Sequence, residues 1–352
     1  MKTNLLFALC LFFVMDLDGQ TVNNVQLTHM QKETKRSEIN LPDIPGYITL
    51  KCDFHMHTIF SDGSVWPTVR VDEAWAEGLD AIAITDHIEN QPSKKFVGGD
   101  HNASYDIAMP RAQERNIILI RGGEITRSMP PGHLNGLFLT DVNALDTPEA
   151  KDAIKAVADQ GGFILWNHPG WKAQQPDTCL WMDMHQELYE QGLIHGIEVF
   201  NEKEWYPIVL DWCRDKKLAV IGNSDIHGVN SHYYDVENNY RPMTLVFSKD
   251  RSEAGIKEAM FARRTLAWFD GKVAGDEALL KQFVMAAIDV KTKAAGELLL
   301  ENMSCIPFML QDETGNKYLL PAESKIVVTV QDGTLKVMNT HTGSKENLEI
   351  RF

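Results

Sequence analysis

The sequence has no excess of basic residues, since its 352 residues contain 34 lysines and arginines against 49 aspartates and glutamates, a formal net charge of −15. A chain this acidic has no spare basic face for a phosphate backbone, which argues against DNA or RNA as a partner. A small phosphorylated substrate is compatible with this charge, because bound metal ions can reverse the local field.

Cysteines are few and scattered. Apart from Cys10 near the start, Cys52, Cys179, Cys213 and Cys305 are far apart and form no CxxC pair. Their spacing indicates neither a disulfide framework nor a thiolate metal site, so we expect buried single cysteines.

Long hydrophobic runs are also missing. The apolar run from Leu5 to Met15 is too short to span a bilayer, which takes about twenty residues. With Lys2 before it and Gly19 after it, the run is typical of a secretory signal peptide. We therefore expect residues 1–19 to be removed and residues 20–352 to be exported, periplasmic or secreted, with no transmembrane segment. A buried N-terminal helix is the alternative, but the segment lacks an amphipathic period.

After a polar lead-in over residues 20–45, short apolar runs alternate with stretches of helical spacing at 67–77, 147–160 and 205–217. This alternation predicts parallel strands and an α/β fold, and seven or eight such units favour a closed barrel over residues 46–270. The predicted strands are 48–54, 81–85, 117–120, 134–139, 163–166, 197–200, 218–221 and 243–247.

Residues 271–352 differ in character. A helix is predicted over 277–288, and Thr314-Gly315-Asn316 and Asp332-Gly333 are turn signals between apolar runs. We expect a small, mainly β C-terminal domain that could bind a glycan or a protein. Its one histidine, His341, makes no ligand cluster, so we expect the chemistry to belong to the barrel. Strands are predicted at 298–300, 306–310, 318–320, 325–330 and 335–338.

Six histidines each lie at, or just past, the carboxyl end of a predicted strand, the edge where α/β folds bind ligands. They are His55, His57, His87, His133, His168 and His227, and they share this edge with Asp62, Asp86, Glu124, Glu198 and Asp225. So many histidines and carboxylates at one edge indicate a metal site.

The first cluster, Asp53-Phe54-His55-Met56-His57, shows how an ion could be held. Residues two apart on a strand point to one side, so His55 and His57 can bind the same ion. The Ser61-Asp62-Gly63 turn can bring Asp62 back to it. Imidazole and carboxylate without thiolate suit zinc, manganese or iron.

The motifs DFHMHTIFSDG, AITDH, GGEIT, GHLN, NHPGW and GNSDIH occur in this order over about residues 50–270. They resemble the successive motifs of the PHP (polymerase and histidinol phosphatase) superfamily. The resemblance implies a metal-dependent phosphoesterase on a distorted seven-stranded β/α barrel.

Carried over residue by residue, the resemblance implies a first ion held by His55, His57, Glu124 and Asp225. Glu124 would bridge to a second ion held by His133 and His168, and Asp62, His87 and His227 would hold a third. Some relatives have histidine where this chain has Asp62, which could shift the preference toward a harder ion such as manganese.

Other polar residues have supporting roles in this interpretation. Asp86, beside His87, is expected to orient a ligand ring without binding metal itself. Glu198 and Asn201 either line the site or form a satisfied polar pair at the rim.

The implied reaction is hydrolysis of a small phosphate ester by a metal-bridging hydroxide, with two or three divalent ions (zinc, manganese or iron) and with Glu124 and Asp225 as catalytic residues. Arg127 and Lys172 are candidates for binding the substrate phosphate, or are solvated surface charges. No serine-nucleophile motif or glycine-rich phosphate loop competes with this interpretation.

Two alternatives stay open. A metal-dependent amide or lactone hydrolase would attack a carbonyl by similar chemistry, and its carboxylate product distinguishes it from a phosphatase. In a binding protein, by contrast, the metals would only brace the barrel.

Overall fold

The computed structural model describes residues 30 and 35–351, except 237–238, 295 and 332. The chain divides into two compact units, residues 1–35 and 36–352, and almost all described residues belong to the second. The signal peptide expected over 1–19 lies outside the described residues. Within the described part, no helix is long and apolar enough to cross a membrane.

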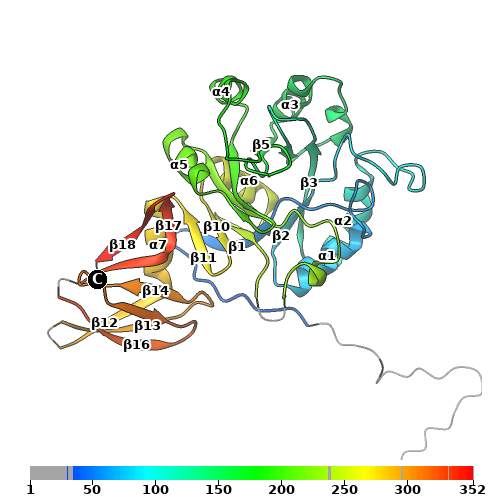
Figure 1. The fold of residues 1–352 in the computed structure, drawn as a ribbon. Helices are drawn as coiled ribbons and strands as arrows, with labels where there is room; N and C mark the ends of the chain where they lie inside the picture. Colours follow the sequence, from blue (N-terminus) through cyan, green and yellow to red (C-terminus); the bar gives the residue numbers. More distant parts are fainter. Residues whose placement is uncertain (1–29, 31–34, 237–238, 295, 332, 352) are drawn as a thin grey trace, which may run out of the picture. The chain divides into compact units, whose positions relative to one another are not determined.

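The second unit has an α/β fold in which all eight strands expected over residues 46–270 are present (Figure 1). They are β1 (Ile48–Asp53), β2 (Ala81–Ile84), β3 (Ile118–Ile125), β4 (Leu134–Leu137), β5 (Phe163–Trp166), β6 (Gly196–Asn201), β8 (Ala219–Asn223) and β9 (Met243–Ser248), with a short β7 (Glu204–Trp205) after β6.

The expectation of parallel strands is wrong for two of them. β4 runs antiparallel to both β3 and β5, and β9 runs antiparallel to β1. A parallel neighbour needs a long crossover, usually a helix. The β3–β4 connection is short, and the described residues of the β8–β9 connection contain only the 3-10 turn η3 (Asn230–His232). His133 therefore precedes the start of β4 instead of following the end of a strand, and it reaches the same edge of the sheet because β4 is reversed.

Helices cover the strands on their outer side (Figure 1). Helices were expected between most of the strands; the three whose ranges were given are present, and α2, α4 and α6 are three more. Pro110 lies inside α2, and such a proline reads in a sequence as a helix breaker. The helices are α1 (Pro67–Ala76), α2 (Ala103–Arg115), α3 (Ala150–Asp159), α4 (Asp183–Glu190), α5 (Pro207–Lys216) and α6 (Glu253–Phe261), with a 3-10 turn η2 (Val142–Leu145).

The sheet curves so that β8 returns against β9. Thr244 Oγ1 of β9 donates to the Gly222 carbonyl over 2.8 Å and accepts from the Gly222 N–H over 3.1 Å. A β-carbon at Gly222 would lie 3.0 Å from Ala267 Cβ of the strand at 265–269, a tight contact that favours glycine at this position. This curvature brings the carboxyl ends of β1, β2, β6 and β8 together.

The C-terminal strands continue the same large sheet. β11 forms a hairpin with β10 and pairs in parallel with β17, at Val273 and Thr340. The strands β12, β13 and β16 form a separate three-stranded sheet. The elements are β10 (Thr265–Phe269), β11 (Lys272–Gly275), α7 (Glu277–Ala287), β12 (Ile288–Ala294), β13 (Glu297–Asn302), β14 (Phe308–Gln311), β15 (Lys317–Leu320), β16 (Lys325–Thr329), β17 (Thr334–Gly343) and β18 (Glu346–Arg351).

The five strands and one helix expected after residue 270 are present, and β11, β12 and β18 are additional. The turn expected at Thr314-Gly315-Asn316 joins β14 to β15. At the other turn, Asp332 lies outside the described residues. A separate fold for residues 271–352 stays a prediction.

One apolar cluster joins the C-terminal region to the first strands. It contains Met56, between the two histidines after β1, together with Phe283 of α7 and Leu348 of β18, all at most 1% exposed. The rings of Phe283 and Phe247 of β9 lie 6.0 Å apart in an edge-on arrangement. Burial of these side chains stabilises the region beneath the histidine edge.

Shortening Phe283 tests this shared core. Phe283→Ala should lower the free energy of unfolding by about 3–5 kcal/mol, because it removes a fully buried ring and leaves a cavity. The matched control Leu319→Ala, at a side chain 55% exposed, should change stability by at most about 0.5 kcal/mol. Denaturant unfolding should show one transition that shifts as a whole. Two transitions, of which only one shifts, would contradict a shared core.

Candidate metal centre

The site begins where β1 ends. The segment after β1 lies parallel to the segment after β8, because the His57 N–H donates to the Ile226 carbonyl over 3.0 Å and the Asp225 N–H donates to the His55 carbonyl over 2.9 Å. These bonds place His55 and His57 beside Asp225, and the three side chains face one another. Both histidines are fully buried.

Four side-chain atoms converge at this point. His55 Nε2 and His57 Nε2 are 3.1 Å apart, and they lie 3.1 Å and 3.0 Å from Asp225 Oδ1. Each of the two nitrogens is 3.4 Å from Glu124 Oε2. Ligands on a tetrahedron around an ion at ~2.0–2.2 Å would lie ~3.3–3.6 Å apart. The observed separations are close to those of a four-ligand ion site.

Further sets of ligands share members with this one. His87, Glu124 and His133 form one set, in which His133 Nδ1 lies 3.1 Å from Glu124 Oε1. His168 Nε2 approaches the same carboxylate oxygen at 3.5 Å. The four sets of converging ligand atoms are His55, His57 and Asp225; His55, Glu124 and His168; His87, Glu124 and His133; and His57, Asp62, His87 and His227.

The set that contains Asp62 is the more open one. Asp62 Oδ1 lies 3.2 Å from His227 Nε2 and 3.5 Å from His87 Nε2. The Asp62 and His227 side chains are 28% and 33% exposed, whereas His57 of the same set is buried. Taken together, the four sets contain all nine residues that the sequence singled out as metal ligands.

Two oxygen atoms test whether metal ions fit this arrangement. Glu124 Oε2 and Asp62 Oδ1 are buried and accept no hydrogen bond. The other oxygen of Glu124 accepts from Asn167 Nδ2 over 2.8 Å. His87 Nδ1 approaches Oε2 to 2.7 Å without the geometry of a hydrogen bond. Buried polar groups without partners are rare, and cations bound at these two atoms would satisfy them. The residues present therefore fit divalent ions.

Comparison with known proteins supports this reading. No family model and no curated protein matches the chain. A crystal structure from Bacteroides vulgatus, of a two-domain protein containing a predicted PHP-like metal-dependent phosphoesterase, is 41% identical. The match covers 91% of this chain and 99% of that one, with a TM-score of 0.87. This chain belongs to the PHP-like family.

Two weaker structural matches share less of the chain. One is a proposed metal-dependent phosphoesterase from Bifidobacterium adolescentis, 18% identical with a TM-score of 0.42, covering 60% of this chain and 96% of that one. The other is an amidohydrolase from Chromobacterium violaceum, 17% identical with a TM-score of 0.39, covering 51% of this chain and 88% of that one.

The charges in the PHP-like site compensate one another. Burial would raise the pKa of Glu124, but His87, His55 and His133 hold it well below its usual range. Burial likewise opposes a charged His87, yet Glu124 and Asp62 raise the pKa of His87 to about 10. In the chain without ions, a proton on His87 thus helps to balance the buried carboxylate of Glu124.

His57 differs from the other ligand histidines. Burial, reinforced by His87 and His227, lowers the pKa of His57 to about 3. The pKa of neighbouring His55 is raised well above its usual value, since Asp225, Glu198 and Glu124 outweigh the effect of burial. His57 is thus neutral near pH 7 and presents a free nitrogen lone pair.

Glu198 positions ligands without joining a ligand set. Its carboxylate lies 2.9 Å from His55 Nδ1 and accepts from the His168 N–H over 2.7 Å. Asn201 and Asn223 donate to the same carboxylate over 2.8 Å and 2.9 Å. Glu198 thereby fixes the ring of one ligand and the backbone of another, and Asn201 touches the site only through Glu198.

Asp86, expected to orient a ligand ring, makes no direct hydrogen bond with one. Its carboxylate accepts from the Thr58 N–H and hydroxyl, over 2.6 Å and 2.7 Å, and from Ser61 Oγ over 2.8 Å. All these donors belong to the turn after β1, which Asp86 faces from the end of β2. Asp86 therefore acts on His57 only through Ser61, whose Oγ is 3.4 Å from His57 Nδ1.

Sequence reasoning missed Arg70, a fully buried residue of α1. Its guanidinium donates to the carbonyls of His57, Ile226 and Gly228 over 2.8 Å, 3.0 Å and 2.7 Å. It therefore ties together the two segments that carry the first ligands. An arginine on an amphipathic helix gives no sequence signal for such a role.

Asn167 was quoted in a motif but given no role. It holds the Glu124 carboxylate and also donates to Asn135 Oδ1 over 2.9 Å. Its position beside His168 at the end of β5 is the signal that could have identified it.

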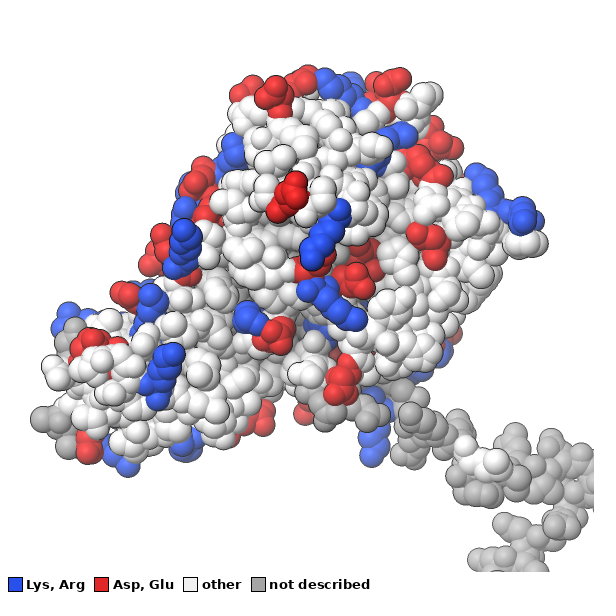
Figure 2. All heavy atoms as spheres, viewed as in Figure 1, with Lys and Arg blue, Asp and Glu red and all other residues white. Residues whose placement is uncertain are grey.

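The two residues expected to bind substrate have different surroundings. Arg127 Nη2 pairs with Glu89 over 2.8 Å and donates to the Thr147 carbonyl over 2.7 Å. Lys172 is exposed and lines a cavity of about 640 Å³. Trp171, which precedes Lys172 in sequence, is 41% exposed, and its ring centroid lies 5.4 Å from that of His168. Figure 2 shows acidic and basic side chains interspersed on the visible face, without a continuous basic patch there.

Metal uptake should release protons. The pKa of His87, at about 10, is above 7, so this ring is protonated at pH 7 and must lose its proton to bind an ion. Zinc added to metal-free protein in weakly buffered solution at pH 7 should lower the pH, and zinc affinity should fall as the pH is lowered. His87→Gln should release fewer protons, while the exposed control His232→Gln should behave as wild type. Zinc uptake with no pH change would contradict this charge balance.

Glu198→Gln tests positioning of the ligands. The substitution keeps the shape but removes the negative charge and replaces one of two accepting oxygens by an NH2 donor, so metal affinity should fall ~10–100-fold. The control Glu204→Gln removes a carboxylate that accepts only from the Tyr206 hydroxyl, and metal affinity should be unchanged. Equal zinc affinities of Glu198→Gln and wild type, measured by competition with a chelator dye, would refute the positioning role.

Proposed function

We propose that this PHP-like protein is an exported phosphoesterase that hydrolyses a small phosphate ester with two or three divalent ions, zinc, manganese or iron. The observation that carries the proposal is Glu124 Oε2, a buried carboxylate oxygen that accepts no hydrogen bond and is surrounded by histidine nitrogens. Metal-dependent phosphoesterase is also the description of the Bacteroides vulgatus relative.

The overlapping ligand sets support more than one ion. His55, His57, Glu124 and Asp225 would hold the first, and Glu124 would share its two oxygens with a second held by His133 and His168. The set of Asp62, His87 and His227 would hold a third. The shared carboxylate is the feature that favours a multinuclear site, since one oxygen faces His55 and His57 and the other faces His133 and His168.

Bound divalent ions would supply Lewis-acid activation of water and neutralise the charge of the phosphoryl oxygens. The chain's own residues fix the geometry for that chemistry. Glu124 and Asp225 balance the positive charge, and Glu198 and Asn167 hold His55 and Glu124 in place. Lys172 is exposed and lines a cavity that includes none of the ligands, and Arg127 would first have to leave its pair with Glu89.

We also propose the finer architecture that the sequence predicted, a distorted barrel over residues 46–270 followed by a small β domain. The contact of Thr244 with Gly222, which closes β8 against β9, supports the barrel. Export rests on the apolar run after Lys2. Mass spectrometry of protein produced in a Gram-negative host would show a mature chain starting near Gln20, and an intact Met1 would contradict it.

The activity is tested on purified, metal-supplemented protein with 4-nitrophenyl phosphate and 4-nitrophenyl acetate. We expect release of inorganic phosphate that stops when the ions are removed by a chelator and returns when zinc or manganese is added. Hydrolysis of the acetate alone would favour a carbonyl hydrolase. Stoichiometric metal without turnover of phosphate esters would contradict the proposal.

Glu124→Gln tests the shared carboxylate. The amide cannot bridge two ions, so phosphatase activity should fall by more than ~100-fold, beyond the effect typical of outer ligand contacts. The chain should stay folded by circular dichroism. Glu301→Gln, in β13, is the control with unchanged activity. More than roughly a tenth of wild-type turnover in Glu124→Gln, at the lower edge of that range, would refute the bridging role.

A further inference from the structure

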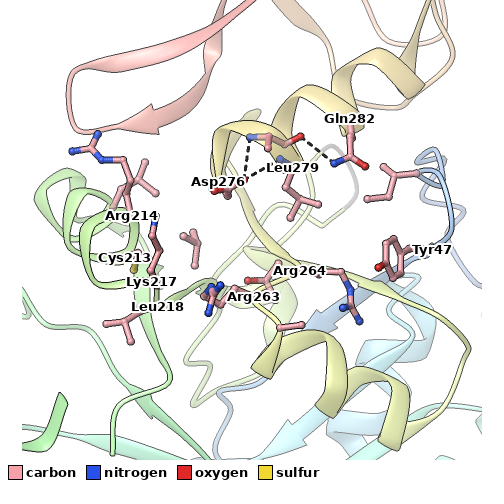
Figure 3. A pocket seen from close by; sticks show the side chains of 17 residues that line it. Tyr47, Cys213, Arg214, Lys217, Leu218, Arg263, Arg264, Asp276, Leu279 and Gln282 are labelled. Atoms are coloured by element: carbon pink, nitrogen blue, oxygen red, sulfur yellow. Dashed lines mark hydrogen bonds between the residues drawn. The ribbon is translucent and has the colours of Figure 1, made fainter. Parts of the chain in front are cut away.

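A second cavity lies at the opposite strand ends from the metal centre. It is formed where α5 and α6 end, where β10 begins and where α7 starts, and its volume is about 340 Å³ (Figure 3). The metal ligands, by contrast, lie at the carboxyl ends of β1, β2, β3, β5 and β8 and, for His133, just before the reversed strand β4. A cavity of this size can hold a small molecule.

The cavity is rich in positive charge. Arg214, Lys217, Arg263 and Arg264 line it together with a single carboxylate, Asp276. Figure 3 shows Arg263 in the middle of the cavity, with Lys217 and Arg264 to either side. In a chain with a net charge of −15, such a local excess of cations is unusual.

Two of these cations are unpaired. Arg264 pairs with Glu258, and Arg214 pairs with Asp215 and Glu346. The side chains of Lys217 and Arg263 have no ion-pair or hydrogen-bond partner among the described residues.

The one carboxylate in the cavity, Asp276, is already engaged. It caps α7 by accepting from the N–H groups of Ala278 and Leu279, over 3.0 Å and 3.2 Å. Both bonds go to Asp276 Oδ1, and in the described part of the chain Asp276 forms no ion pair with Lys217 or Arg263.

Lys217 and Arg263 also occupy unusual backbone positions. Each lies just past the end of a helix with a positive φ, 58° and 59°, where glycine is favoured. Because a helix C-terminus stabilises a cation even without a ligand, this placement alone does not indicate a binding site.

A separate observation points to a ligand. Thr265, at the start of β10, lines the same cavity and is 1% exposed, and its hydroxyl has no hydrogen-bond partner. A buried hydroxyl without a partner is costly, and a ligand that reached it would satisfy it.

We propose that this cavity binds the phosphate group of a small organic phosphate, as a site separate from the metal centre. Lys217 and Arg263 together match the two negative charges that a phosphate monoester carries near pH 7. The Thr265 hydroxyl donates to a phosphate oxygen, and Leu210, Leu218 and Leu279 offer an apolar surface to the organic part.

The test uses full-length, metal-loaded protein and isothermal titration with inorganic phosphate and with phenylphosphonate at low ionic strength. Lys217→Gln/Arg263→Gln removes both unpaired cations, and Lys281→Gln/Lys293→Gln removes the same charge at exposed positions outside the cavity. Wild type and the control should bind both probes at this site. The cavity variant should bind at least ~10-fold more weakly there, because charge-assisted hydrogen bonds are lost.

Any phosphate binding at the metal centre should be the same in all three proteins, as should metal content and turnover, because the cavity lies at the other strand ends. Equal binding by the cavity variant and wild type, or no binding by wild type beyond the metal centre, would overturn the proposal.

Thr265→Val distinguishes a binding role from a structural one. Valine keeps the shape and removes the unpartnered hydroxyl, so thermal stability should be unchanged or higher. Affinity for phosphate should nevertheless fall several-fold. A Thr265→Val protein with wild-type affinity would likewise overturn the proposal.

Discussion

The structure depends on one buried carboxylate. Glu124 is fully buried, and burial of a charged group is costly unless opposite charge compensates it. Here the charge of Glu124 is compensated by histidines next to different strands. The ends of β1, β2 and β5 and the start of β4 must therefore lie at the same place. The curvature of the sheet and the reversal of β4 meet this requirement. The same constraint accounts for Asn167, which holds one oxygen of Glu124 and leaves the other free to meet a cation.

The surroundings hold this charged cluster in place. His168 and Asp225 have positive φ angles, 26° and 49°, which L-residues rarely adopt, and such conformations persist only where neighbouring contacts enforce them. Glu198 holds the backbone of His168, and the His55 carbonyl holds that of Asp225. Arg70 donates hydrogen bonds to the carbonyls of His57 and Ile226 and so fixes the backbone of both segments. Preorganisation of this kind is what a metal site in a hydrolase needs, because the ligands are then already placed before an ion or a substrate binds.

Much of this arrangement could be predicted from the sequence. The strands after residue 46 follow from short β-branched runs, and the pairing of His55 with His57 follows from the two-residue period of a strand. The direction of β4 and β9 could not be predicted in this way, because it depends on which connections lack a helix. Arg70 was also missed, since its role depends on carbonyls far away in the sequence. Asp86 was expected to orient a ligand ring, but its carboxylate accepts hydrogen bonds from the turn after β1. Proximity in sequence to His87 does not fix where its side chain points.

The central claim is that Glu124 and its neighbours hold metal ions. X-ray diffraction from crystals of zinc- or manganese-supplemented protein, recorded on both sides of the metal's absorption edge, tests it most directly. The account predicts an anomalous peak ~2.0–2.3 Å from His55 Nε2, His57 Nε2 and Asp225 Oδ1, and at least one further peak that shares Glu124. Fully supplemented crystals with no anomalous peak among these residues, or with ions bound only elsewhere, would contradict it.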